Sequence, residues 1–345
     1  MMSFKVYPSE ETQRKQPVNL IDSDVYLFHN EFEKTFKEIY SEKFQNVKIL
    51  PNGAVIQKLI KQDLFFCRSI PLHGIGKFKS IIKHYLTTLV QLFKIRKFVR
   101  VENALLVTNF YSDNFFHWLG DVLQKIEVLD LHNFAELKNY TLIIPATCNT
   151  DLAMFTLKQY DVNYLILEKD QCVLSKNLVN IPVISPSGNF RPALMNGIRE
   201  RFTEKINKGP AKDRIFITRE FAPKRKILNE DELKPILLKH GFKVVAMERL
   251  SIEEQIKVAA NAEILVGLHG AGLSNMLWMS QGSKIMEIRA RGDSRNNLFF
   301  SLASDLNLRY FYTFAEPTDK NITTQRTDFI IDTEKFEESL QQLLD

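Results

Sequence analysis

Residues 265–276 read LVGLHGAGLSNM, and this stretch decides how the second half of the chain folds. An apolar run stops abruptly at the four-residue turn HGAG, residues 269–272, and a helix-like segment follows. An apolar strand that leads through a glycine turn into a helix is typical of parallel α/β sheets. The stretch therefore predicts an α/β fold, and it places bare backbone beside a histidine at the end of a strand.

Such a turn suits a phosphate ligand. Ligands of open α/β sheets bind beyond the carboxyl ends of the strands, where a helix N-terminus offers unpaired N–H groups and a partial positive charge. Gly270 and Gly272 lack side chains that would hold a diphosphate away from those groups, and His269 could donate a hydrogen bond to a departing phosphate. The alternative is a tight strand–helix turn without a ligand, since the pattern is not GxGxxG.

Two further features of this half indicate the same chemistry. Arg219 follows the strand-like run RIFIT, and Arg225 stands just before a helix start. Guanidinium groups at such ends bind phosphate oxygens, and the alternative is a pair of solvated surface arginines. Glu287 interrupts the apolar run KIMEIR, where a buried carboxylate needs a partner, either a ribose hydroxyl or a neighbouring base. Together the three features predict a nucleotide site.

Strand-like and helix-like segments alternate along most of the chain. Strands are expected at 103–110, 140–146, 163–169, 214–219, 243–248, 262–268, 284–289 and 309–314. Helices are expected at 114–131, 152–160 and 193–207, and after the capping patterns at Asn229 and Ser251. Pro and Gly interrupt the alternation near 186–211, which indicates a domain boundary.

The predicted organisation therefore has four parts. A polar N-terminal extension with a short helical pattern covers 1–45, and a C-terminal helix covers 331–345. Between them we expect an N-terminal Rossmann-like domain at 46–195 and a C-terminal Rossmann-like domain at 196–330.

Composition limits the classes of function. The 345-residue chain has 46 basic and 41 acidic residues, and its net charge of +5 is too small an excess to predict nucleic-acid binding. Cys67, Cys148 and Cys172 lack disulfide or metal-ligand spacing and are typical of a reduced, cytosolic protein. The polar N-terminal sequence does not resemble a signal peptide, and no apolar run is long enough to span a membrane. A cytoplasmic location is therefore expected.

The segment 77–100, KFKSIIKHYLTTLVQLFKIRKFVR, combines paired apolar residues with basic ends and is expected to be helical. A basic amphipathic helix can lie on an anionic membrane surface, which would make the protein peripheral to the membrane. The alternative is a helix that packs on its own domain and keeps its charges in water.

Asn114, His117 and Asp121 fall on one stripe of the expected helix 114–131, apart from its apolar face. The stripe begins just after the strand 103–110, so it faces a ligand cleft. His117 and Asp121 are four residues apart and can hydrogen-bond, and either could take a proton from a hydroxyl acceptor. The alternative is a helix cap at Asn114 with a solvated His–Asp pair.

These motifs, taken in order, resemble glycosyltransferase family 61. They are NFFHWLGDVL, FITRE followed by KRKILNEDEL, ERLSIEEQ, and GLHGAGLSNMLWM followed by KIMEIR. The family includes bacterial capsular-polysaccharide transferases, plant xylan arabinosyl- and xylosyltransferases, and animal protein O-GlcNAc transferases of the endoplasmic reticulum. The resemblance runs from about residue 103 to about residue 290.

The resemblance implies a GT-B fold, with two Rossmann-like domains facing a cleft, and an inverting, metal-independent transfer from a nucleotide sugar to a glycan hydroxyl. The donor site would comprise Arg219, Arg225, His269, Gly270, Ala271, Gly272, Asn275 and Glu287, with Glu287 near the ribose. Asn114, His117 and Asp121 would face the acceptor, with Asp121 as the favoured general base and His117 positioning or replacing it. No metal or cofactor is implied, and the one DxD sequence, Asp22-Ser23-Asp24, lies in the polar extension.

The sequence departs from the eukaryotic relatives because it shows no signal anchor or luminal stem. This favours a bacterial-type enzyme of capsule, O-antigen (lipopolysaccharide) or other surface-polysaccharide synthesis. Such enzymes commonly extend a lipid-linked glycan, which would give the segment 77–100 a purpose. A non-catalytic GT-B-like protein that binds a nucleotide or a glycan is the alternative. A Rossmann oxidoreductase would need a GxGxxG fingerprint, which neither half contains.

Overall fold

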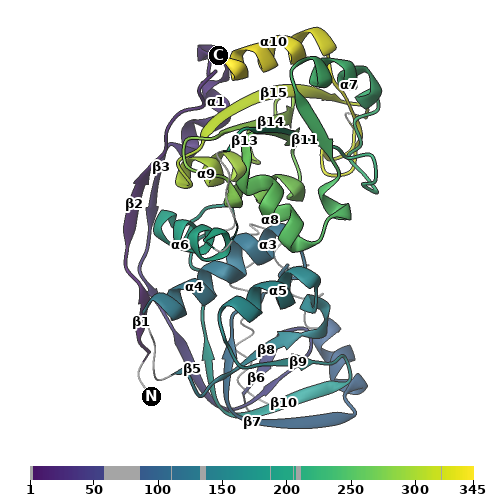
Figure 1. The fold of residues 1–345 in the computed structure, drawn as a ribbon. Helices are drawn as coiled ribbons and strands as arrows, with labels where there is room; N and C mark the ends of the chain where they lie inside the picture. The colour runs from purple at the N-terminus through teal and green to yellow at the C-terminus, as the bar shows by residue number, and fades with distance from the viewer. Residues whose placement is uncertain are drawn as a thin grey trace. The chain divides into compact units, whose positions relative to one another are not determined.

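The computed structural model describes residues 3–57, 86–109, 111–132, 137–186, 188–204, 206, 211–319 and 321–345. The chain forms two compact units (Figure 1). Unit 1 comprises Met1–Glu10 and Phe36–Ile184, and unit 2 comprises Glu11–Thr35 and Ser185–Asp345. The last change of unit lies close to the Pro- and Gly-containing region where the sequence predicts a domain boundary.

Unit 2 is built on a sheet with the strand order β12-β11-β13-β14-β15-β16. All neighbouring strands are parallel except β16, which is antiparallel to β15. The strands are β11 (Asp213–Ile217), β12 (Phe242–Val245), β13 (Ala262–Leu268), β14 (Lys284–Ala290), β15 (Arg309–Pro317) and β16 (Phe329–Ile330). β13 and β14 are buried along almost their whole length, as expected for parallel strands that are covered on both faces.

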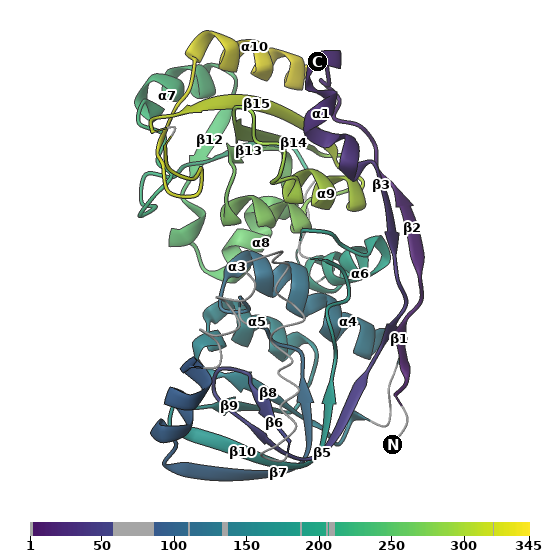
Figure 2. The same ribbon diagram turned by 180° about the vertical axis from the view of Figure 1, so that it is seen from behind.

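Helices cover both faces of this sheet (Figures 1 and 2). The helices of unit 2 are η1 (Asp22–Asp24), α1 (Val25–Phe28), η2 (His29–Glu31), α6 (Pro192–Thr203), α7 (Glu230–Lys239), η7 (Met247–Arg249), α8 (Ile252–Ala260), η8 (Ala271–Trp278), α9 (Leu298–Asp305) and α10 (Thr333–Leu344). Phe216, Val266 and Met286 point to one face, where they share a core with α7 and α10. On the opposite face, a Cβ atom added to Gly267 would lie only 3.2 Å from Leu273 of the 3-10 helix η8. The α/β prediction is confirmed for this unit.

Unit 1 contains a second mixed sheet, with the strand order β6-β5-β10-β7-β8-β9. From β10 to β9 the neighbours are parallel, whereas β5 is antiparallel to both β10 and β6. Its strands are β5 (Glu42–Ile49), β6 (Val55–Ile56), β7 (Lys97–Leu106), β8 (Thr141–Pro145), β9 (Tyr164–Leu167) and β10 (Gln171–Asn180). Short pairs join β1 (Lys5–Tyr7) with β4 (Ile39–Tyr40), and β2 (Glu10–Gln13) with β3 (Glu33–Phe36).

The long helical region of unit 1 follows β7 and changes its winding on the way. α3 (Phe115–His117) leads into a π-helix (Trp118–Val122) and then into α4 (Leu123–Leu131). Trp118 Nε1 donates a hydrogen bond of 2.9 Å to Thr156 Oγ1 of α5 (Asp151–Gln159), which ties the two helices together. A short 3-10 turn, η6 (Ala146–Cys148), precedes α5. π-turns inside α-helices occur frequently at functional sites.

In each sheet, one strand has the next strand of the chain on one side and a later strand on its other side. The switch point is the gap between that strand and the later one. In unit 2, β11 lies between β12 and β13, so the switch point lies between β11 and β13. In unit 1, β7 lies between β8 and β10, so the switch point lies between β7 and β10. Open α/β sheets bind their ligands at the carboxyl ends of the strands at such points. The fold therefore places one candidate ligand edge in each unit.

The predicted N-terminal extension is corrected by the structure. The segment 31–44 contains β3, β4 and the beginning of β5 instead of a helix, and residues 11–35 are part of unit 2. Its apolar residues fit a helical spacing, but pairing with β2, β1 and β10 overrides that local preference. The C-terminal helix is present as α10, and it packs into the core of unit 2.

The basic segment 77–100 is also corrected in part. Residues 77–85 lie outside the described residues, residues 86–94 are helical, and β7 begins at Lys97. Backbone pairing with β10 extends from Lys97 to Leu106, so the basic end of the segment lies on a strand. Among the residues that the structure describes, no helix combines the length and hydropathy needed to cross a bilayer.

Two helix starts test the capping predictions. Ser251 forms a full capping box with Glu254 at the start of α8, which confirms that prediction. α7 begins after Asn229 as predicted, but the Asn229 side chain donates to Ile331 O at 2.8 Å instead of capping the helix.

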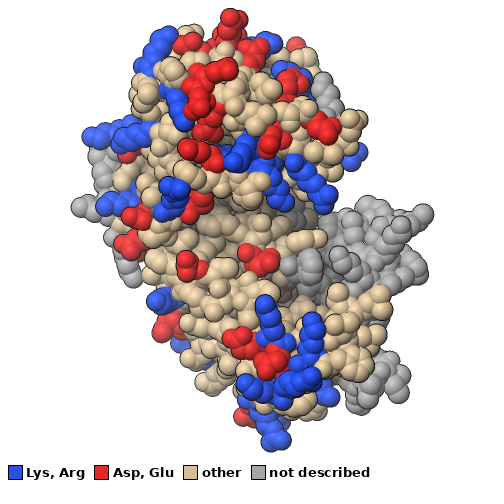
Figure 3. Space-filling view, turned by 90° about the vertical axis from the view of Figure 1, so that its right-hand side faces the viewer, with Lys and Arg blue, Asp and Glu red and all other residues tan. Residues whose placement is uncertain are grey.

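On the face drawn in Figure 3, acidic and basic side chains are interspersed over unit 2, the upper part of the view.

We predict that Phe336→Ala lowers the free energy of unfolding of unit 2 by about 3–5 kcal/mol, because it leaves a cavity where α10 meets the sheet. The chain has two tryptophans, Trp118 in unit 1 and Trp278 in unit 2. Urea titration of 5-fluorotryptophan-labelled protein, followed by ¹⁹F NMR, should show a lower midpoint at Trp278. Gln341→Ala, on the exposed side of α10, is the control and should change stability by less than about 0.5 kcal/mol. Equal midpoints for the two variants would contradict this packing.

Candidate functional site

Two arginines converge on the glycine turn at the switch point of unit 2. Arg225 Nη1 donates to the carbonyl oxygen of His269 at 2.9 Å, and Arg219 Nε donates to the carbonyl oxygen of Arg225 at 2.7 Å. A Cβ atom added to Gly270 would lie 2.6 Å from Arg219 Nη1 and 3.6 Å from Arg225 Nη2. A side chain at position 270 would therefore displace the Arg219 guanidinium group from the turn, whereas its contact with Arg225 would be an ordinary one. Gly270 has an extended backbone with φ 173°, so space and not conformation requires a glycine here.

The arginine pair is electrostatically incomplete. Burial, followed by the charge of Arg225, lowers the pKa of Arg219 to about 10, and burial lowers the pKa of Arg225. Arg225 Nε is buried without a hydrogen-bond partner, and within the described residues neither guanidinium makes an ion pair with a carboxylate. Arg225 also holds a positive φ of 58°, a conformation that arginine rarely adopts. The carboxylates of Glu248, Glu230 and Asp328 act on Arg219 from a distance without forming an ion pair with it, so an anion bound at the two crowded cations would stabilise them.

The backbone of the turn adds neutral donors to this site. Because the first turn of a 3-10 helix lacks intrahelical acceptors, the N–H groups of residues 270–272 are free for a ligand at the start of η8. Gly272 is needed for packing, since a Cβ atom there would lie 3.3 Å from Ile217 Cγ2. Asn275 is fully buried, and its Nδ2 donates to Gly272 O at 3.0 Å. Asn275 therefore stabilises the turn through this hydrogen bond instead of facing a ligand.

His269 is held by a buried carboxylate. His269 Nδ1 hydrogen-bonds to Glu287 Oε1, and Tyr310 donates its hydroxyl hydrogen to Glu287 Oε2 at 2.5 Å. Burial alone raises the pKa of Glu287, but the charges of Arg289 and His269 outweigh it and the net pKa lies below the ordinary value. An ionised carboxylate only accepts hydrogen bonds, so Nδ1 carries the proton and Nε2 is the nitrogen left to act on a ligand.

Glu287 consequently does not have the ligand contact expected from the sequence. It has no exposed surface, and its two oxygens are occupied by His269 and Tyr310. Of the two partners considered for this carboxylate, the structure contains the neighbouring base, His269. Arg289 completes the network, with Nη1 3.6 Å from Glu287 Oε2 and Nη2 2.8 Å from Asn297 Oδ1.

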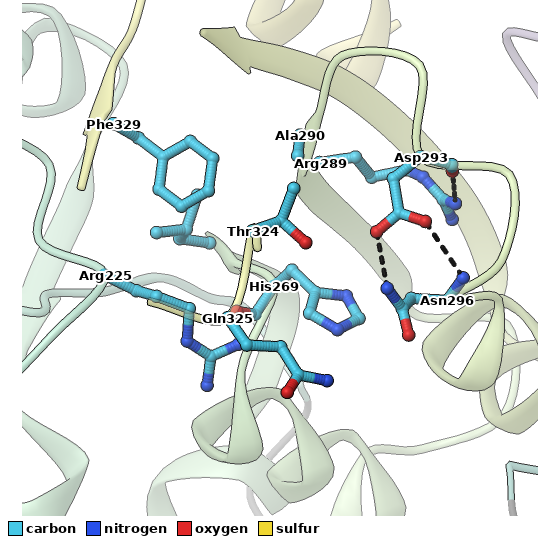
Figure 4. A pocket seen from close by; sticks show the side chains of 10 residues that line it. Arg225, His269, Arg289, Ala290, Asp293, Asn296, Thr324, Gln325 and Phe329 are labelled. Carbon is cyan, nitrogen blue, oxygen red and sulfur yellow. Dashed lines mark hydrogen bonds between the residues drawn. The ribbon is translucent and has the colours of Figure 1, made fainter. Parts of the chain in front are cut away.

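A pocket opens beside His269 at the carboxyl ends of β13 and β14 (Figure 4). Its walls include Arg225, the polar side chains of Asn296 and Gln325, and the carboxylate of Asp293. Asp293 is fixed by Asn296, whose Nδ2 donates to Oδ2 at 2.5 Å and whose backbone N donates to Oδ1 at 3.2 Å. The pocket is thus lined by preorganised amide and carboxylate groups next to the arginine pair.

Of the three residues predicted on the acceptor side, two form a hydrogen-bonded pair and the third caps a helix. His117 Nδ1 hydrogen-bonds to Asp121 Oδ2 at 2.8 Å, and the His117 ring stacks on Tyr111 with centroids 5.2 Å apart. The His117 side chain is 23% exposed and that of Asp121 only 6%. Asn114 instead accepts a 2.9 Å hydrogen bond from the Phe116 backbone N and caps α3. These residues follow β7, one of the two strands that border the switch point of unit 1.

Comparison with known proteins finds similarity to glycosyltransferases. Residues 115–286 match the family model for Glycosyltransferase 61. The EGF domain-specific O-linked N-acetylglucosamine transferase of Drosophila melanogaster is 34% identical over 137 residues, which cover 38% of this chain and 26% of that protein. The β-1,2-xylosyltransferase XAX1 of Oryza sativa subsp. japonica is 23% identical over 235 residues, which cover 60% of this chain and 41% of that protein.

The chain belongs to glycosyltransferase family 61. The family match begins at α3 and ends within β14, so it includes His117, Asp121, both arginines and the glycine turn. The chain spans about a quarter to two fifths of the length of the relatives named above. The matched range therefore contains the His117–Asp121 pair, the two arginines and the glycine turn, whereas Asn114 and Glu287 lie just outside it and are described by the structure alone.

Sequence reasoning did not identify two buried, positively charged residues of the site regions, Lys125 and Arg289. Lys125 lies one turn beyond Asp121 and is 3% exposed; burial lowers its pKa to about 8, against the opposing charges of Asp121 and Glu42. Its i+4 spacing from Asp121 was the available signal. Arg289 lies two residues after Glu287 on the same face of β14, so strand alternation could have identified it as the carboxylate's partner.

The DxD sequence has a structural role in unit 2. Asp24 Oδ2 accepts a 2.7 Å hydrogen bond from the Tyr312 hydroxyl group, which ties η1 to β15. Among the described residues, no group of three or more His, Cys, Asp or Glu side chains is arranged to hold a metal ion.

Gly270→Ala should weaken pyrophosphate binding about 10- to 150-fold, because the added methyl group displaces Arg219 from the turn. Calorimetry in EDTA measures this, and circular dichroism should show an unchanged fold. Gly282→Asn is the control, since Gly282 has a φ of 81° that asparagine tolerates and no atom within 4 Å of an added Cβ. Equal pyrophosphate affinity in the two variants would exclude the turn as the anion site.

Proposed function

We propose that this protein is an inverting, metal-independent glycosyltransferase of the GT-B type. It would transfer a sugar from a nucleotide sugar to a hydroxyl group of a glycan acceptor. The observation that carries the proposal is the pair Arg219 and Arg225, which makes no ion pair with a described carboxylate and lies on the backbone of the glycine turn, at the switch point of a doubly wound sheet. Membership of family 61 and the second polar cluster in unit 1 support it.

The donor diphosphate would lie between the arginine pair and the N–H groups at the start of η8. Its charge would form the direct ion pairs that Arg219 and Arg225 do not make with described carboxylates, and the two guanidinium groups would supply the positive charge that a metal ion supplies in other transferases. His269, oriented by ionised Glu287 through Nδ1–H, would as an imidazolium donate a second hydrogen bond, from Nε2–H, to the departing phosphate. Asn275 supports the turn, and Ala271 supplies a backbone N–H.

The acceptor hydroxyl would lose its proton to the His117–Asp121 pair. Sequence reasoning favours Asp121 as the base, and the geometry moves our proposal to His117. Asp121 is nearly buried and bonded to Nδ1, whereas His117 is the more exposed partner and keeps Nε2 for the proton. Deprotonation lets the acceptor oxygen attack the anomeric carbon as its bond to the diphosphate oxygen breaks. Attack from the side opposite the leaving group inverts the anomeric configuration.

His117→Ala and Asp121→Asn should each lower the rate of sugar transfer about 10²- to 10⁴-fold and leave nucleoside diphosphate affinity within about threefold. A panel of nucleotide sugars is incubated with glycan acceptors, and nucleoside diphosphate release is measured in EDTA. Glu102→Gln, an exposed change in the same unit, is the control. Proton NMR of the product would show the opposite anomeric configuration from the donor.

Three outcomes would contradict this proposal. Unchanged activity in both variants would remove the His–Asp pair from catalysis. Nucleotide binding by wild type without turnover on any acceptor would favour the alternative, a non-catalytic GT-B-like protein that binds a nucleotide or a glycan. A requirement for magnesium or manganese would contradict the metal-independent mechanism.

We further propose that the acceptor is a lipid-linked glycan of bacterial capsule, O-antigen or other surface-polysaccharide synthesis, handled in the cytoplasm at the inner face of the membrane. Residues 86–100 would contact the lipid. Phe93 and Phe98 are 80% and 61% exposed. Basic residues accompany them and no acidic residue interrupts the segment; these are Lys94, Arg96, Lys97 and Arg100. Buried, free Cys148 and Cys172 fit a reducing compartment.

The membrane contact predicts sedimentation with vesicles that contain anionic phosphatidylglycerol and little sedimentation with phosphatidylcholine alone. Phe93→Ser with Phe98→Ser should reduce the bound fraction at least about tenfold, because two aromatic side chains no longer enter the interface. Leu238→Ser is the control, since Leu238 is 68% exposed on unit 2, outside this segment. Binding that is independent of lipid charge, or that survives the double substitution, would contradict the contact.

A further inference from the structure

An exposed aromatic ring and a guanidinium group meet at the same edge of the unit 2 sheet as the anion site. Phe221 lies two residues after Arg219 in the loop that follows β11, and its side chain is 43% exposed. Arg249 ends η7, the turn that follows β12, and its Cζ lies 3.4 Å from the centroid of the Phe221 ring. The preceding residue, Glu248, is close enough to raise the pKa of Arg219. The Phe221–Arg249 pair therefore flanks the arginine pair on its β12 side.

We propose that Phe221 and Arg249 form the platform that stacks on the base of a bound nucleotide. This inference rests on the proposed function, because it identifies the end of the donor that lies on the β12 side. Aromatic rings and guanidinium planes are the groups on which proteins stack nucleobases. Arg249 is exposed, and its guanidinium makes no ion pair with any described carboxylate, so its plane remains available.

The opposite flank of the glycine turn has a different chemistry. There the pocket beside His269 is lined by Asn296, Gln325 and Asp293, which suit hydroxyl groups of a sugar (Figure 4). Its one aromatic residue, Phe329, is 2% exposed and belongs to the hydrophobic core, so it offers no ring face to a base. A diphosphate held at Gly270 would thus have an aromatic, cationic flank on the β12 side and a polar flank on the β14 side. The base belongs on the first of these.

The test compares a nucleoside diphosphate with inorganic pyrophosphate, which has the phosphates but no base. Calorimetry in EDTA measures both ligands on wild type and on Phe221→Leu, after UDP, GDP, ADP, CDP and dTDP have been screened for the tightest. Phe221→Leu keeps an apolar side chain and removes the ring. We expect the nucleoside diphosphate to bind about 5- to 150-fold more weakly and pyrophosphate to bind unchanged. Arg249→Gln should show the same selectivity with a smaller effect.

Phe4→Leu is the matched control, because it removes the ring of another cation–π pair, with Lys43 Nζ 5.0 Å from the Phe4 centroid in unit 1. It should change neither affinity. If wild type binds both ligands and Phe221→Leu changes neither, the platform is wrong and the proposed function stands. If Phe221→Leu weakens both ligands equally, Phe221 acts only through the Arg219 loop and the platform is wrong. If wild type binds neither ligand, the proposed function fails, and this inference fails with it.

Discussion

The close contact between two guanidinium groups and one glycine is the constraint on which the rest of the site depends. Arg219 occupies the volume that a side chain at position 270 would need, and Arg225 lies in contact with the edge of that volume. The described carboxylates that act on Arg219 do so without forming an ion pair with it, so the end of β13 still attracts negative charge. The fold supplies the position, since the strand order of the sheet puts its switch point between β11 and β13.

The buried carboxylate behind this site explains why a histidine is present. An ionised Glu287 without solvent contact is costly unless its oxygens are satisfied, and His269, Tyr310 and Arg289 satisfy them. The same arrangement fixes the tautomer of His269 and directs Nε2 away from the carboxylate. His117 and Asp121 repeat this arrangement in unit 1, where the less exposed carboxylate also holds Nδ1. In each unit a carboxylate orients an imidazole that follows, along the chain, a strand bordering the switch point.

Local sequence signals predicted the parts that local chemistry controls. The apolar run, the glycines and the Ser251 capping box specify β13, its turn and the start of α8 without reference to other parts of the chain. Long-range pairing was not predictable in this way. The helical spacing of 31–44 gives way to β3 and β4 because strands β2 and β1, more than twenty residues away, pair with them. The partner of Glu287 was not predictable because it depends on β13, which His269 follows, lying beside β14 in the sheet. The burial of Lys125 depends on packing that a single sequence does not display.

The most direct test of the donor site is the position of a diphosphate in a crystal structure of the protein grown with its tightest-binding nucleoside diphosphate in EDTA. We predict phosphate oxygens within about 3 Å of the Arg219 and Arg225 guanidinium nitrogens and of backbone N–H groups in the turn 269–272. His269 Nε2 should face the terminal phosphate. A diphosphate bound elsewhere on the chain, or bound at the turn only when a divalent metal is added, would contradict the site described above.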